Sequence, residues 1–345
     1  MRSWCRPCGW GGGAVGRLGW RAAATAVLAA LSAGVVAGCG AAAQGGAKPG
    51  PAGSARPLGQ RPGQVFYVSD QTSAARELAK TKGPDARSLT RIADQPSALW
   101  LGGEDARAEA EDLTIKAAAA GRTALIVAYD IPHRDCGRFS AGGAVDAAAY
   151  RDWIDRLAAG LADRAAWVIL EPDAVAHTLD GCLTPAAAAE RYDLLAYAVT
   201  ELKKQPKVRV YLDAGNAGWL KDQDRLADAL RRAGIAGADG FSVNVSNFYT
   251  TEQSSEYGGK LSALLGGKHY VIDTSRNGNG PLGDRDWCNP AGRALGEAPT
   301  TGTGRPGVDA YLWIKNPGES DGDCGRGEPK AGEFWLSYAL GLAHG

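Results

Sequence analysis

In the stretch Trp167-Val-Ile-Leu-Glu-Pro-Asp173, four apolar residues are followed by two acids with one proline between them. The apolar run does not alternate with polar residues, which is expected for a strand that is covered on both faces. Helical patterns lie before and after it, over 147–161 and 185–204. The second helix has a favourable start, because Thr184 can cap it and Pro185 fits its first turn. A strand between two helices indicates a parallel sheet.

The same alternation continues in both directions from this stretch. The other predicted strands cover 65–68, 98–101, 124–131, 208–212, 241–245, 270–272 and 310–314. The other predicted helices cover 106–120, 225–233, 259–265 and 332–342. This pattern predicts an α/β fold with a parallel sheet, either open or closed. The roughly 280 residues from 64 to 345 suit one barrel domain.

Acidic residues follow five of the predicted strands. In a parallel barrel the carboxyl ends of all strands lie on one face, where active sites form. A single acid after a strand is explained more simply as a helix cap or a solvated loop residue, but five such strands indicate a shared site. Tryptophans lie on or near the same rim, and ten Trp against five Phe indicate flat apolar platforms near water, of the kind that stack on sugars or lie at interfaces. The acids are Asp130, Asp135, Glu171, Asp173, Asp213, Asp273, Glu319 and Asp321, and the tryptophans are Trp100, Trp219, Trp287 and Trp313.

Clustered carboxylates without a nucleophile motif fit two chemistries. In glycoside hydrolysis, one carboxylic acid protonates the leaving oxygen and another helps water to attack. The alternative is a metal site with oxygen ligands. The sugar-stacking tryptophans favour glycoside hydrolysis, and four scattered His are too few for a zinc cluster. We therefore predict no metal site.

Other function classes are disfavoured by charge and by motif. Lys+Arg and Asp+Glu are both 38, so the chain lacks the basic surplus of a nucleic-acid binder. No GxSxG, HExxH or Walker A sequence occurs. The glycines at 278, 280 and 283 match GxGxxG in spacing only, because Pro281 and Trp287-Cys288 follow where a helix should begin.

The N-terminal region has the features of a processing signal. Arg17 and Arg21 precede a short apolar run that ends in Val36-Ala-Gly-Cys39, which resembles a bacterial lipobox. We predict a lipoprotein-type signal peptide over 1–38, lipidation of Cys39 and a flexible Ala/Gly/Pro tether over 39–63. The folded domain then covers 64–345. The alternative is an ordinary signal that is cleaved nearby, with an incidental Cys. Either way the protein is exported, and it lies on the outer face of the cell membrane as a lipoprotein or is secreted.

The number of cysteines in the predicted domain supports export. Without Cys5, Cys8 and Cys39, four of the seven cysteines remain: Cys136, Cys182, Cys288 and Cys324. An even set in an exported chain predicts two disulfides, with three connectivities open.

Six motifs, in order, resemble those of glycoside hydrolase family 6. The resemblance covers almost all of 64–345. It implies a distorted (β/α) barrel of parallel strands in a single domain, inverting hydrolysis of β-1,4-glucan and no cofactor. The motifs are Tyr129-Asp-Ile-Pro-His-Arg-Asp-Cys136 with Ser140-Ala-Gly-Gly143, Leu170-Glu-Pro-Asp-Ala174, Tyr211-Leu-Asp-Ala-Gly-Asn-Ala-Gly-Trp219, Asp273-Thr-Ser-Arg-Asn-Gly-Asn-Gly280, Trp287-Cys-Asn-Pro290 and Lys315-Asn-Pro-Gly-Glu-Ser-Asp-Gly322.

The resemblance also implies residue roles. Asp173 corresponds to the general acid, and Asp135 to an aspartate that raises the pKa of the acid by like-charge proximity. Asp321 corresponds to the catalytic base, and Tyr129 to a tyrosine at the cleavage point. The implied disulfides are Cys136–Cys182 and Cys288–Cys324. The implied substrate-binding residues are Trp100, Asp213, Asn216, Trp219, Asn247, Trp287, Lys315 and Glu319, with Asn216 standing where many members carry His.

Loop length bears on the mode of cleavage. Only twelve residues, 322–333, separate Asp321 from Phe334, and the segment from Asp135 to Tyr150 is compact. Short loops favour an open cleft, so we expect an endoglucanase. We also expect the protein to be a monomer. One alternative is an exo-acting cellobiohydrolase of the same family. Another, from a different class, is a non-catalytic glycan-binding surface lipoprotein, which the intact acids disfavour.

Overall fold

The computed structural model describes residues 63–284 and 286–345. The predicted signal peptide, Cys39 and all but the last residue of the predicted tether lie outside these residues. Within them, no helix is both long enough and apolar enough to span a bilayer.

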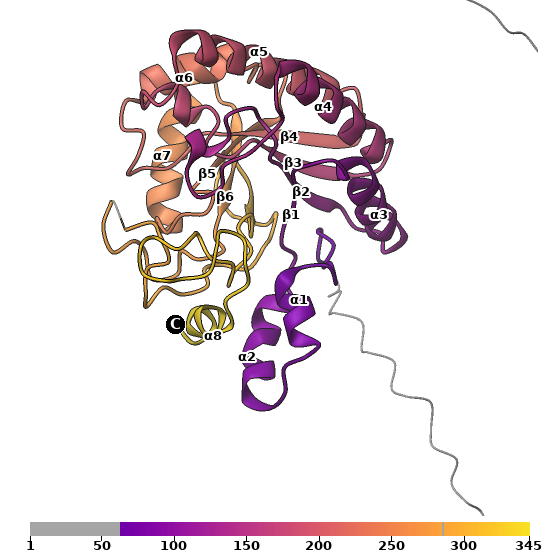
Figure 1. Ribbon diagram of the computed structural model, residues 1–345, viewed down its shortest axis with the longest axis vertical. Coiled ribbons are helices and arrows are strands. Elements are labelled where there is room, and N and C mark those ends of the chain that lie inside the picture. Colours follow the sequence, from indigo (N-terminus) through magenta and orange to yellow (C-terminus); the bar gives the residue numbers. More distant parts are fainter. Residues whose placement is uncertain (1–62, 285) are drawn as a thin grey trace, which may run out of the picture. The chain divides into compact units, whose positions relative to one another are not determined.

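Seven strands form one parallel sheet in chain order, each paired with the next (Figure 1). Every residue of β2 and β3 is buried, which confirms the prediction of strands covered on both faces. The strands are β1 (Leu99–Leu101), β2 (Ala124–Ala128), β3 (Ala166–Leu170), β4 (Val208–Asp213), β5 (Gly240–Val243), β6 (His269–Asp273) and β7 (Val308–Leu312).

The curl of the sheet separates two cores. Alternate strand residues such as Ile126 and Val168 pack outward against helices, and Figure 1 shows α3 to α7 in an arc outside the strands. Their neighbours Val127 and Ile169 face an inner core that contains buried residues from five strands, β2, β3, β4, β6 and β7, and no helix residue; Trp100 of β1 packs against it. The sheet therefore encloses its own apolar interior, as a barrel does.

The barrel is distorted where its first and last strands meet. Across the described residues, the strand pairings run only from β1 to β7 and none joins β7 back to β1. The gap is bridged instead by hydrogen bonds just beyond the strands. The Ala98 amide donates to the Trp313 carbonyl at 3.0 Å, and the Trp100 indole donates to the Ile314 carbonyl at 2.8 Å. The predicted distorted barrel is thus confirmed.

The helices agree with the predictions in the middle of the chain and differ near its ends. The predicted strand at 65–68 is wrong: it forms only a bridge from Phe66 to Thr123, because β1 occupies the same edge of β2 from Ile126 onward. The last helices have other bounds than predicted, and two further helices precede β1. The helices are α1 (Ser73–Leu78), α2 (Gly83–Ala93), α3 (Ala106–Ala119), α4 (Ala147–Leu161), α5 (Pro185–Leu202), α6 (Gln223–Arg232), α7 (Thr251–Leu264) and α8 (Leu336–His344).

Local start signals explain the beginnings of α7 and of the two helices before β1. Helix α7 begins eight residues before the predicted start because Thr250 and Gln253 form a reciprocal capping box. Thr72 caps α1 through the Ala75 amide, and Pro84 lies in the first turn of α2. Both signals are present in the sequence.

Candidate active site

Asp173, the predicted general acid, meets Asp213 at the carboxyl ends of β3 and β4. The Asp173 amide donates to Oδ2 of Asp213 at 3.0 Å, and the Gly215 amide donates to the same oxygen at 3.1 Å. Ser242 donates to Oδ1 at 3.2 Å. These bonds hold the buried Asp213 carboxylate in place. Burial, then the Asp213 charge, raises the pKa of Asp173 to about 7, so that this carboxyl can carry a proton near neutrality.

Asp135 completes a compact acidic group with Asp173. One carboxyl oxygen from each lies within 4.8 Å of the other and of a ring nitrogen of His177. The Ser140 amide fixes Asp135 by donating to Oδ2 at 2.7 Å. Asp135 and Asp173 both have left-handed backbone, at φ 51° and 69°, which costs a non-glycine residue about 1 kcal/mol. Such strain is typical of functional positions.

Sequence reasoning missed His177. It follows Asp173 by one turn, and its amide donates to the Asp173 carbonyl at 2.9 Å. Its buried ring has Nδ1 at 2.9 Å from Asp180 and Nε2 at 3.7 Å from Oδ1 of Asp135. Burial lowers the pKa of His177, but the carboxylates of Asp135 and Asp180 outweigh it and raise the pKa overall. The available signal was the spacing Asp173-x-x-x-His177.

Tyr129 lies next to the acidic pair, as predicted. Burial raises its pKa above the ordinary value, and the charges of Asp173 and Asp135 add to this, so the phenol stays protonated. Its ring meets that of Trp100 edge-on, with centroids 5.1 Å apart. The guanidinium of Arg134 lies over the Tyr129 ring at 4.7 Å. These contacts fix a rigid aromatic wall beside Asp173.

Asp321 has the opposite electrostatic environment. Burial raises its pKa, but Arg276 and Lys315 together lower it below the ordinary value. Arg276 donates to Oδ2 at 2.8 Å, the Asn289 amide donates to the same oxygen at 3.0 Å, and Lys315 Nζ lies 3.6 Å from Oδ1. Asp321 is therefore ionised. Arg276 is fully buried against the Phe248 ring and was not among the predicted site residues.

Two of the strand-end acids hold the scaffold. Asp273, fully buried at the end of β6, accepts from the amides of Ser246, Ser275 and Lys315 at 3.0 Å each. Glu171 accepts from the amides of Asp130 and Ile131 at 3.0 to 3.1 Å. Each carboxylate therefore fixes the position of loops that follow neighbouring strands: the loops after β5 and β7 for Asp273, and the loop after β2 for Glu171.

The predicted platforms differ in exposure. Trp287 is 41% exposed and meets Phe139 edge-on, as expected for a surface that receives a ligand. Trp219 contacts the His177 ring, with centroids 5.1 Å apart. Trp313, by contrast, is buried against α1, α2 and α8, so it is a core residue and not part of the rim.

The remaining predicted substrate-binding residues make hydrogen bonds to other groups of the protein. Asn216 Oδ1 accepts from the amides of Gly218 and Trp219 at 3.1 and 3.2 Å, which shapes the loop that carries Trp219. Asn247 Oδ1 accepts from the Phe248 amide at 2.9 Å. Glu319 is held by Ser73 of α1 at 2.5 Å, and burial raises its pKa.

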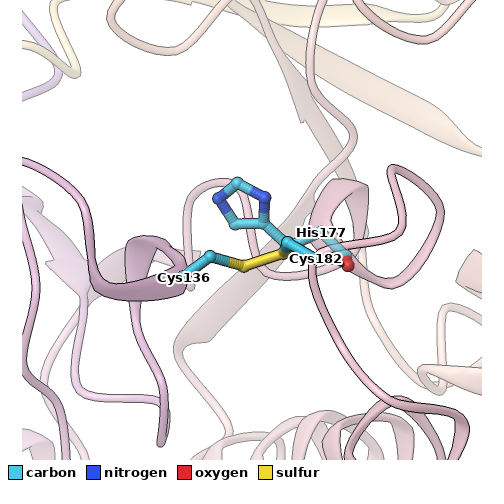
Figure 2. A group of neighbouring side chains, drawn as sticks. All are labelled: Cys136, His177 and Cys182. Carbon is cyan, nitrogen blue, oxygen red and sulfur yellow. Dashed lines mark hydrogen bonds between the residues drawn. A yellow bond between two sulfur atoms is a disulfide. The ribbon is translucent and has the colours of Figure 1, made fainter.

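Two disulfides frame the acidic residues, with the pairing that the resemblance implies. Cys136–Cys182 joins the loops after β2 and β3, and Cys288–Cys324 joins the loops after β6 and β7, with Cα atoms 6.2 and 6.5 Å apart. Figure 2 shows the His177 ring beside the first bridge.

Comparison with known proteins gives a consistent result. Residues 62–345 match Glycosyl hydrolases family 6. Endoglucanase A of Cellulomonas fimi is 45% identical over 287 residues, which cover 82% of this chain and 62% of that protein. Endoglucanase 1 of Streptomyces halstedii is 42% identical, over 81% of this chain and 88% of that protein. The solved Mycobacterium tuberculosis endoglucanase Cel6, in complex with methyl-cellobiosyl-4-deoxy-4-thio-β-D-cellobioside, is 47% identical with a TM-score of 0.78, over 84% of this chain and 99% of that one.

Proposed function

Because this chain belongs to glycosyl hydrolase family 6, we propose that it is an inverting endo-β-1,4-glucanase that hydrolyses cellulose or a related β-glucan. The observation that carries the proposal is the contrast between two carboxyl groups. Asp173 is held with its pKa raised to about 7, whereas Asp321 is held ionised by Arg276 and Lys315. Glycoside hydrolysis needs one protonated and one ionised carboxyl group.

In this mechanism Asp173 protonates the glycosidic oxygen as the bond to the anomeric carbon breaks. The hydrogen bond from the Asp173 backbone amide to Oδ2 of Asp213 fixes the strained turn that presents the Asp173 carboxyl group. Asp135 disfavours ionisation of Asp173 by like-charge repulsion, which keeps the proton available. Tyr129, next to both acids, lines the point of cleavage as an uncharged phenol.

Water attacks the opposite face of the sugar, and Asp321 accepts its proton directly or through a second water molecule. The bonds from Arg276 and Asn289 occupy Oδ2, so Oδ1 is the oxygen that remains for water. Lys315, 3.6 Å from Oδ1, keeps this carboxylate charged but makes it a weak base. Inversion results because no carboxylate bonds to the sugar.

Cleavage within the chain is supported by the short connection between Asp321 and Phe334. Glu319 and Phe334 pair in antiparallel fashion, which closes this connection into a short loop. The relatives named as endoglucanases agree. The test is carboxymethylcellulose hydrolysis with product analysis: an early fall in viscosity with few new reducing ends supports endo action, and a slow fall with mainly cellobiose supports a cellobiohydrolase.

The role of Asp173 is tested by Asp173→Asn. We expect this variant to lose cleavage of unactivated glucan by at least about 100-fold while retaining glucan binding, because only proton donation is lost. Activity within a few-fold of wild type would contradict the assignment. If the wild type binds glucan but does not cleave it, and Asp173→Asn binds glucan as well as the wild type, the result favours the alternative of a non-catalytic glycan-binding protein.

We also propose that the protein acts outside the cell as a monomer, anchored through a lipid on Cys39. The two disulfides support an oxidising compartment. Two acyl chains hold a protein stably on a membrane, so Cys39→Ser should release it from the membrane fraction. Wild-type protein found in the medium, with a mature N-terminus elsewhere than Cys39, would contradict the anchor.

A further inference from the structure

Three groups that can bind a metal ion converge beside the predicted acid. A carboxyl oxygen of Asp135, a carboxyl oxygen of Asp173 and a ring nitrogen of His177 lie within 4.8 Å of one another. For three atoms within 4.8 Å of one another, there is always a point no more than about 2.8 Å from all of them. Zinc binds nitrogen and oxygen at about 2.0 to 2.2 Å, so side-chain shifts below about 1 Å bring all three into its coordination sphere.

The ring of His177 is oriented as a ligand would be. Nδ1 is bonded to Asp180 at 2.9 Å, which leaves Nε2 facing Asp135. Nε2 is buried and has no hydrogen-bond partner among residues 63–284 and 286–345, since its 3.7 Å separation from Oδ1 of Asp135 is too long for a hydrogen bond. A carboxylate behind a metal-binding histidine is the usual arrangement in metal sites, because it sets the tautomer and raises the basicity of the other nitrogen.

The nearby cysteines define the frame of this cluster but do not supply ligands. Cys136 follows Asp135, and Cys182 comes two residues after Asp180. Their sulfurs are joined in a disulfide beside His177 (Figure 2), so they are not thiolates. The bridge fixes the loops that carry Asp135 and Asp180 on either side of the ring.

We propose that Asp135, Asp173 and His177 form a site for a divalent transition-metal ion, with Zn²⁺ as the best fit. Two carboxylates and one imidazole match the ligands that zinc takes, and their two negative charges balance the ion. Bound zinc would hold Asp173 deprotonated. The consequence, inhibition by zinc, rests on the proposed function, whereas the binding itself does not.

The experiment is calorimetric titration of the full chain with zinc chloride, without reductant or chelator, for wild type and variants. We expect one zinc ion per molecule in wild type and affinity at least about 100-fold weaker in His177→Ala. Asp180→Ala, which removes only the residue behind the ring, should weaken affinity about 10- to 100-fold. Cobalt substitution, followed by its visible absorption, reports coordination independently of enzyme activity.

A matched control is available in His269, whose Nδ1 lies 2.7 Å from Asp309 in an exposed pair. His269→Ala removes a similar histidine–aspartate pair elsewhere and should leave zinc affinity unchanged. The proposal is overturned if wild type binds no zinc at millimolar concentration, if His177→Ala binds as well as wild type, or if Ca²⁺ binds as tightly as Zn²⁺. A chain that binds zinc through His177 but does not cleave glucan would sustain this site and refute the proposed function.

Discussion

Replacing Asp135 by Asn tests the electrostatic coupling at the active site. The variant removes the negative charge while its amide oxygen can still accept from Ser140, as Asp135 does at 2.7 Å. Without that charge, ionisation of Asp173 becomes easier and its pKa falls. Because Asp173 must be protonated to act, activity should be lost at a lower pH than in wild type.

The size of the shift follows from the separation of the carboxyl groups. At the 4.8 Å limit, two unit charges repel by about 3.5 kcal/mol at an effective dielectric constant of 20, and by about 0.9 kcal/mol in bulk water. At 1.36 kcal/mol per pKa unit, these energies correspond to about 2.5 and 0.6 units. Asp135 is partly exposed and faces His177, so we expect a shift of about one unit downward.

The assay is kcat/KM on a soluble cello-oligosaccharide as a function of pH. In wild type the basic limb should lie near the Asp173 pKa of about 7, and in the variant about one unit lower. Asp309→Asn is a matched control, because Asp309 lies near the amino end of β7, away from the carboxyl-end site. A basic limb that stays within 0.2 units of wild type (about the precision of such profiles), or that moves upward, would refute the coupling.

Three further predictions test other parts of the structure. Arg276→Met should raise the pKa of Asp321 and move the acidic limb of the pH profile upward. It should also destabilise the fold by about 3–5 kcal/mol, measured by urea unfolding, because the buried Asp321 loses its hydrogen-bonded cation and keeps only Lys315, at 3.6 Å from Oδ1. Replacing Cys288 and Cys324 together by Ser should lower the free energy of unfolding by roughly 4 kcal/mol in the chain-entropy model, and unchanged stability would contradict this. Trp287→Ala should raise KM for long oligosaccharides several-fold with kcat nearly unchanged, because the stacking it removes is about equal in ground and transition states.

The amino-acid sequence was sufficient to predict the central strands and the rim of acids. The runs that became β2 and β3 are apolar throughout, so burial on both faces could be read from composition alone. Short helices such as α1 are harder, because six residues carry too little periodicity, and only the cap at Thr72 indicates them.

The sequence could not show which acids stabilise the scaffold and which face the active site. Glu171 and Asp173 are two residues apart, yet one accepts backbone amides inside the scaffold and the other faces the site. Arg276 is 45 positions from Asp321, and only the closure of β6 against β7 brings them within 2.8 Å. The scattered positions of the four histidines gave no indication of a role for His177, because its partners are the carboxylates of Asp135 and Asp180 rather than other histidines.

The stereochemistry of the product distinguishes an inverting site from a retaining one. Proton NMR of a β-glucan digest, recorded before mutarotation, reports the anomer that forms first. We expect the α-anomer, because Asp173 donates the proton and water activated at Asp321 attacks from the opposite face. A β-anomer formed first would contradict the inverting mechanism and the role of Asp321 as base.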